Sequence, residues 1–114
     1  MDSPSLDELN LLHAGVCQAL GDPKRLYILY ALSEQPRHVS ALAADLNMPQ
    51  PTVSRHLQVL RDRHLVTSER DGAAVIYRLT EPRVIDVLDM MRQILRDSLT
   101  RQSDVLSPAI TEPS

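Results

Sequence analysis

Apolar residues recur along the chain at two spacings, and these spacings predict most of the secondary structure. Apolar side chains that return every three or four residues predict helices over residues 6–20, 23–32, 39–46, 48–60 and 81–99. Apolar and polar residues mixed at strand-like spacing predict strands over residues 65–70 and 74–79, joined by Asp71-Gly72. We therefore expect a mainly α-helical fold with one small β-hairpin between the fourth and fifth helices.

Breaker residues define where these helices begin and end. Gly21 ends the first helix, and Asp22-Pro23 supplies an N-cap followed by a proline at the first helical position. Asn47-Met48-Pro49 breaks the third helix. Because the third and fourth helices are short and joined by a tight turn, they predict a helix-turn-helix.

The helix over residues 48–60 has one apolar face and one polar face. Val53, Leu57 and Leu60 recur on the side expected to pack inward. The opposite side carries amide, hydroxyl and guanidinium groups, which can meet base edges and phosphates in the major groove of DNA. These outward residues are Gln50, Thr52, Ser54, Arg55 and Gln58. Two neighbouring amphipathic helices also occur in ordinary all-α proteins, but the hairpin that follows favours a winged helix.

Three segments of the chain resemble the ArsR/SmtB family of bacterial winged-helix repressors. The first reads Leu20-Gly-Asp-Pro-Lys-Arg-Leu-Tyr-Ile-Leu, the second reads Gln50-Pro-Thr-Val-Ser-Arg-His-Leu, and the third is the Gly72-containing hairpin that ends in Tyr77-Arg-Leu. The resemblance implies a homodimeric transcriptional repressor that leaves an imperfectly palindromic DNA operator when an inducer binds. It also implies a DNA-facing role for His56, which occupies the family's histidine position, although packing against the turn is the alternative.

We expect the first turns of the fourth helix to read base edges and the hairpin arginines to contact phosphates. The predicted DNA-contacting set is Gln50, Thr52, Ser54, Arg55, His56, Gln58, Arg70 and Arg78. The formal net charge of -3 argues against indiscriminate nucleic-acid binding. The expected DNA-facing segment reverses the sign locally, because it carries Arg55, Arg61, Arg63, Arg70 and Arg78.

The chain is expected to dimerise through its first and last helices. With no Trp or Phe and three Tyr among 114 residues, the core must be mostly aliphatic, so a partner would help to bury it. The last helix carries a wide apolar stripe, for which an ordinary core position is the alternative. The predicted interface residues are Leu9, Leu12, Val16, Leu88, Met91 and Leu95. We expect one domain over residues 1–101 and a disordered tail over 102–114, which contains two prolines.

Neither metal site typical of the resembled family is intact in this sequence. The position of the family's cysteine box falls on residues 38–42, where His38 replaces the cysteine and Ala41 replaces the acidic residue. The second site needs histidine ligands from the last helix, but no histidine follows His64. Asp86, Asp89 and Asp97 remain there, and carboxylates alone are poor ligands for soft metals. We expect no metal and no cofactor.

The single cysteine leaves the nature of an effector open. Cys17 lies four residues after His13 on the same face of the first helix, so a thiol sensor or a metal site shared across a dimer is one interpretation. A small apolar filler is the favoured alternative. One cysteine forms no internal disulfide, and the chain shows neither a signal peptide nor a long apolar span, so a cytoplasmic protein is expected.

Two other classes of function are alternatives to a DNA-binding regulator. An enzyme would need convergent catalytic groups, and the histidines are spread over unrelated elements, so we expect no enzyme. A winged helix without an inducer, which binds DNA constitutively or acts as a protein adaptor, is the stronger alternative.

Overall fold

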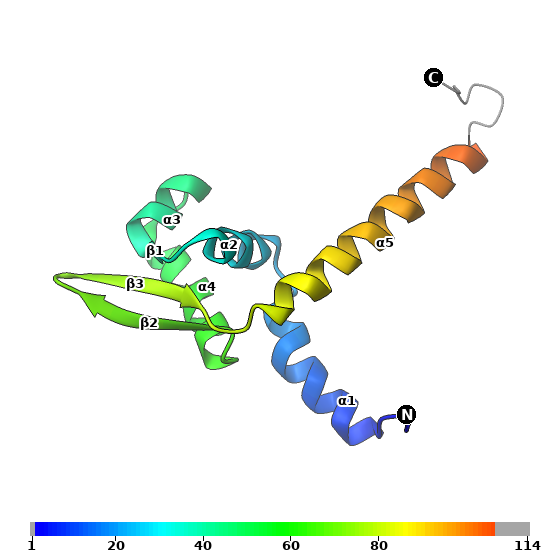
Figure 1. Cartoon of the computed structure of the whole chain (residues 1–114), viewed down its shortest axis with the longest axis horizontal. Coiled ribbons are helices and arrows are strands. Elements are labelled where there is room, and N and C mark those ends of the chain that lie inside the picture. The colour runs from blue at the N-terminus through cyan, green and yellow to red at the C-terminus, as the bar shows by residue number, and fades with distance from the viewer. Residues whose placement is uncertain (1, 107–114) are drawn as a thin grey trace. The chain divides into compact units, whose positions relative to one another are not determined.

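A computed structural model describes residues 2–106 of the chain. Its elements in order are α1 (Leu6–Leu12), η1 (His13–Cys17), α2 (Pro23–Glu34), β1 (Arg37–His38), α3 (Val39–Leu46), α4 (Gln50–Asp62), β2 (Val66–Asp71), β3 (Ala74–Leu79) and α5 (Arg83–Leu106) (Figure 1). The chain divides into two compact units, one ending at Pro82 and one beginning at Arg83, and each is described by itself. Over the described range, no helix combines the length and apolar character needed to cross a membrane.

The first predicted helix is confirmed, with an unpredicted π-helical turn inside it. Ser5 caps α1, because its hydroxyl accepts a hydrogen bond from the Glu8 N–H at 3.1 Å. Residues 13–17 form η1, and α-helical geometry resumes at residues 18–19. A single π turn changes the helical repeat over too few residues for an apolar pattern to reveal it.

Helix α2 begins as its sequence predicts. Asp22 has an extended backbone, and its carboxylate accepts a hydrogen bond from the Lys24 N–H at 2.8 Å, while Pro23 occupies the first helical position. Ile28 and Leu29 are fully buried. The helix ends at Glu34, two residues beyond the predicted end.

Helices α3 and α4 form the predicted helix-turn-helix. Asn47 adopts a left-handed conformation with φ of 54°, and its N–H donates to the Ala43 and Ala44 carbonyls, which ends α3 sharply. Helix α4 begins at Gln50 instead of Met48, because Pro49 is extended and serves as its N-cap residue. Val53, Leu57 and Leu60 are fully buried, and the burial of each contributes about 2 kcal/mol.

The predicted hairpin is present, but its turn lies one residue later than expected. Asp71 pairs with Ala74, so the two turn residues are Gly72 and Ala73, and Gly72 adopts a φ of 66°. A glycine with positive φ at the first turn position suits a tight hairpin, because no Cβ opposes it. Strand β1 was not predicted, since its two residues are too few to form a pattern.

Strand β1 pairs antiparallel with β3, which gives a sheet of order β1-β3-β2. Helix α2 packs against α3, α4 and β3, and α4 packs against β2. In Figure 1 the β2–β3 hairpin projects beyond the helices of this unit. A helix-turn-helix followed by such a hairpin is a winged helix, and this confirms the predicted fold.

Helix α5 is longer than its sequence pattern suggested. It continues past Leu99 to Leu106, so residues 102–106 are helical and the predicted start of the tail is wrong. The rest of the predicted tail, residues 107–114, lies outside the described residues. Met91 and Leu95 are more than half exposed at 54% and 56%, whereas Leu88 is buried.

Candidate nucleic-acid interface

The exposed face of α4 carries most of the residues predicted to read DNA. Gln50, Ser54, Arg55 and Gln58 are exposed, and Thr52 is half-buried. Because the opposite face of α4 is anchored by buried aliphatic residues, these polar side chains are presented from a fixed support.

Two side-chain contacts run along this face. The Arg55 guanidinium donates to the Thr52 hydroxyl at 3.4 Å, and the Gln58 amide donates to the Asp62 carboxylate at 2.8 Å. Both contacts are exposed, so water or a nucleic acid can replace them at little cost. The arrangement leaves donors and acceptors at the surface that can be redirected toward a ligand.

The hairpin places Arg70 and Arg78 on different faces. Arg70 pairs with Val75 and Arg78 pairs with Thr67, and successive residues of a strand point to opposite sides. Arg70 therefore shares the face of the buried Val66 and Tyr77. Arg78 lies on the outer face, where its Nε donates to Glu69 Oε1 at 2.8 Å.

A second arginine accompanies Arg70 at the junction of α4 and the hairpin. Arg61, near the end of α4, lines a shallow pocket of about 330 Å³ together with Ser68, Glu69, Arg70, Val75 and Tyr77. Two guanidinium groups and a hydroxyl around one open pocket form a suitable environment for an anion such as a phosphate. Arg61 belongs to the predicted DNA-facing segment but not to the predicted contact set, although the spacing of Ser54, Gln58 and Arg61 puts all three on neighbouring helical positions.

His56 lies differently from the other residues of the predicted contact set. It is half-buried, and its Nδ1 is 3.3 Å from Nη1 of Arg25 on α2. The imidazole is therefore directed toward α2, which agrees with the packing alternative better than with base reading.

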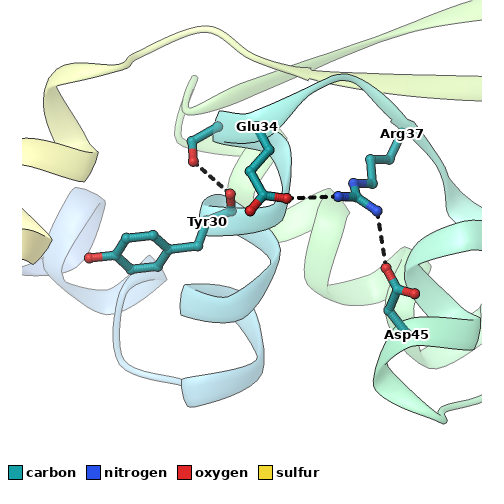
Figure 2. A network of polar contacts seen from close by, with 5 residues as sticks. Tyr30, Glu34, Arg37 and Asp45 are labelled. Carbon is teal, nitrogen blue, oxygen red and sulfur yellow. Dashed lines mark hydrogen bonds and ion pairs between the residues drawn. The ribbon is translucent and has the colours of Figure 1, made fainter.

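An arginine at β1 holds the first helix of the helix-turn-helix in place. Arg37 forms ion pairs with Glu34 at 3.0 Å and with Asp45 at 3.2 Å, as Figure 2 shows. These contacts tie the end of α2 to α3. In the same view the ring of Tyr30 points away from this network, while its carbonyl accepts a hydrogen bond from Ser33 at 2.6 Å.

His38, at the position of the family's metal-binding cysteine, contacts the hairpin instead. Its Nε2 is 2.8 Å from Oδ2 of Asp71, the last residue of β2. Within residues 2–106, the structure contains no group of three or more His, Cys, Asp or Glu side chains that could hold a metal ion.

Cys17 and His13 are both exposed on the N-terminal helical segment. Cys17 fills no core within the single chain, so its interpretation as a small apolar filler applies to a dimer interface and stays a prediction. Leu9 and Leu12 on the same segment are 42% and 48% exposed, and Val16 is half-buried.

The charge environment near the start of α2 favours an ionised carboxylate. The hydrogen bond from the Lys24 N–H lowers the pKa of Asp22 below its ordinary value of 3.8, and the charges of His56, Arg25 and Lys24 act in the same direction. Burial opposes these effects without reversing them.

The sequence matches a known family and several of its members. Residues 22–68 match the family described as "Bacterial regulatory protein, arsR family". The HTH-type transcriptional repressor SmtB of Mycobacterium tuberculosis is 39% identical over 83 residues, which cover 72% of this chain and 62% of that protein. The nodulation protein NolR of Rhizobium meliloti is 34% identical over 84 residues, covering 74% and 69% of the two chains.

A solved structure agrees with these relatives. The homodimeric winged helix-turn-helix DNA-binding domain Mb0332 from Mycobacterium bovis, described as a possible ArsR-family regulator, superposes with a TM-score of 0.67 at 29% identity. The match covers 98% of this chain and 99% of that one. The chain spans slightly less than two thirds of SmtB but more than two thirds of NolR. On these matches and this fold, the chain belongs to the arsR family of bacterial regulatory proteins.

Proposed function

We propose that this protein is a dimeric transcriptional repressor that binds operator DNA and releases it when an effector acts at the dimer interface. The observation that carries the proposal is the exposed polar face of α4, supported by the fully buried Val53, Leu57 and Leu60. SmtB is described as a transcriptional repressor and Mb0332 as a homodimeric DNA-binding domain, which supports extending these roles to the present chain.

In this proposal the helix and the hairpin have separate tasks. Gln50, Thr52 and Ser54 read base edges in the major groove, and Arg55 and Gln58 contact bases or phosphates. Arg61 and Arg70 hold a phosphate at the pocket between α4 and β2. Arg78 contributes less, because binding a phosphate would require it to leave Glu69.

The dimer uses the exposed apolar residues of the N-terminal segment and of α5. Leu9, Leu12, Met91 and Leu95 are each at least 42% exposed in the single chain, and a partner copy would cover them. Two copies related by a twofold axis present their α4 helices about 34 Å apart, which matches half-sites of an imperfect palindrome. An effector that binds the two dimer geometries unequally would change this spacing. Because the proposed partner is the DNA of a bacterial cell, we infer that the protein acts in the cytoplasm.

The test begins with selection of bound duplexes from a random DNA library by the wild-type protein. Binding to the selected duplex and to a scrambled duplex of the same composition is then titrated by fluorescence anisotropy at several salt concentrations. We expect the selected duplex to bind at least about 1,000-fold more tightly, with affinity falling as salt rises. Equal affinity for the two duplexes would contradict the proposal and favour a protein adaptor.

The effector is tested on the same duplex. Reduced, chelator-treated protein is titrated before and after addition of an oxidant or a thiol-reactive metal ion, in parallel with Cys17→Ser protein. Loss of binding only when Cys17 is present would assign the sensing role to that thiol. Unchanged binding in every arm would favour another effector or constitutive binding.

A further inference from the structure

Arg25 belongs to the first of the resembled segments, yet none of the roles above uses it. Its side chain is half-buried in the first turn of α2. Its Nε donates to the Ala19 carbonyl at 2.6 Å and its Nη2 donates to the Gln18 carbonyl at 3.1 Å. Its Nη1 lies 3.3 Å from Nδ1 of His56 on α4. One guanidinium thus joins the end of the N-terminal helical segment to the middle of α4.

At the end of the N-terminal segment Arg25 supplies a partner for the Ala19 carbonyl and a second partner for the Gln18 carbonyl, which also accepts from the Gly21 N–H at 3.2 Å. The last carbonyls of a helix have no partner within it and carry partial negative charge. Ala19 is fully buried, so without Arg25 its carbonyl would lose a hydrogen bond that water cannot readily replace. Arg25 therefore anchors the point at which the N-terminal segment ends and the chain turns at Gly21.

The contact between Arg25 and His56 has one possible donor, the Arg25 guanidinium. A guanidinium has donors only, so this contact is a hydrogen bond when Nδ1 of His56 accepts, which requires the neutral ring with its proton on Nε2. A second contact runs in parallel, because Nη2 of Arg63, just after α4, donates to the Gln18 side chain at 3.4 Å. The N-terminal segment is thus linked to the middle of α4 through Arg25 and to the residue that follows α4 through Gln18.

We propose that Arg25 is a positioning residue that couples the N-terminal segment to α4, so that movement of this segment changes operator affinity without altering any DNA contact. The inference rests on the proposed function, because it assumes that α4 binds DNA. The contacts of Arg25 provide a physical route from the N-terminal segment to α4. Binding or modification at the exposed face of this segment, which carries apolar residues and the Cys17 thiol, would change the position of α4 by this route. Cys17 directly precedes Gln18, whose carbonyl Arg25 holds.

The test compares Arg25→Gln with Lys24→Gln, which removes the same charge from the adjacent, exposed position. Both are titrated on the duplex selected by the wild-type protein, at several salt concentrations, with dimerisation and thermal unfolding recorded in parallel. We expect Arg25→Gln to bind about tenfold more weakly, because it loses charged hydrogen bonds. Its salt dependence should equal that of the wild type, since no phosphate contact is lost. Lys24→Gln should bind like the wild type.

A double variant distinguishes coupling from direct contact. His56→Met removes the acceptor that faces Arg25, whereas His56→Gln keeps an acceptor oxygen. Combining His56→Met with Arg25→Gln should weaken binding no further than Arg25→Gln alone, because the two residues act through one contact. If Arg25→Gln does not fold, the pair of His56 variants carries the test, with His56→Met expected to bind more weakly than His56→Gln.

Three results would overturn the inference: Arg25→Gln binding like Lys24→Gln, a salt slope reduced by about one as for a lost phosphate contact, or equal binding by the two His56 variants. Failure of the wild type to prefer the selected duplex would instead contradict the proposed function. The two failures are therefore separable within one series of titrations.

Discussion

Arg70 and Arg78 lie on opposite faces of the hairpin, with Arg70 next to the turn end of β2 and Arg78 near the far end of β3. Arg70 shares its face with the buried Tyr77 and lines a pocket with Arg61, whereas Arg78 is held by Glu69 on the outer face. A charged side chain already paired with a carboxylate has less to gain from a phosphate than an arginine beside a second arginine. The two residues are therefore expected to differ in their contribution to DNA binding.

Arg70→Ala should weaken operator binding and reduce the slope of log affinity against log salt by about one, because one phosphate contact is lost. Arg78→Ala, the matched variant on the opposite face, should change the slope less. Anisotropy titrations at four or more salt concentrations measure both slopes. A larger loss for Arg78→Ala would contradict the assignment of Arg70 to the DNA-facing side.

Gln50→Ala should lower discrimination between the operator and base-substituted duplexes by about 1–3 kcal/mol at one position, since a bidentate amide contact distinguishes bases by that amount. Competition titrations with a panel of single-base substitutions measure this effect. Gln35→Ala changes an exposed glutamine at the end of α2 and serves as the control. If both variants keep the base preferences of the wild type, Gln50 is not a base reader.

Leu57→Ala should destabilise the protein by about 2–5 kcal/mol, because Leu57 is fully buried on the inward face of α4 and the substitution leaves a cavity. Urea unfolding followed by circular dichroism at one fixed protein concentration measures the change, since dimerisation makes stability depend on concentration. Tyr27→Ala, at a tyrosine of α2 that is 47% exposed and outside the proposed interface, should cost far less. Equal losses would show that α4 does not pack through Leu57.

Asp22→Ala should destabilise α2 by about 1 kcal/mol through loss of the N-cap, whereas Asp22→Asn keeps a capping oxygen. The pKa of Asp22 is lower in the folded than in the unfolded chain, so ionisation stabilises the fold above the ordinary value of 3.8. That contribution is lost as pH falls below 3.8 and through the folded-state pKa. Thermal unfolding between neutral and acidic pH should show a smaller acid loss for Asp22→Asn than for the wild type.

Leu95→Glu should weaken the dimer and, with it, operator binding, because a carboxylate would be buried at the proposed interface. Leu95 is 56% exposed in the single chain, so the substitution should leave the fold of the monomer intact. Gln93→Glu adds the same charge to an exposed position of α5 and is the control. Sedimentation velocity gives the oligomeric state, and an unchanged dimer in Leu95→Glu would place the interface elsewhere.

Local signals in the sequence determined most of the winged helix. The apolar residues of α4, the Asp22-Pro23 start of α2 and the break at Asn47 each specify geometry within a few residues, because helix periodicity and capping are short-range effects. The sequence analysis did not separate Arg70 from Arg78, because strand alternation assigns residues of two strands to faces only once their pairing is known.

The tertiary structure decided which of these polar residues meet. The turn at Gly72-Ala73, instead of Asp71-Gly72, shifts the strand pairing by two residues and brings Glu69 diagonally beside Arg78. Arg25 and His56 are 31 residues apart, and no local pattern relates them. Contacts of this kind depend on how α2 packs against α4 and on strand register, so they arise only when the whole unit folds.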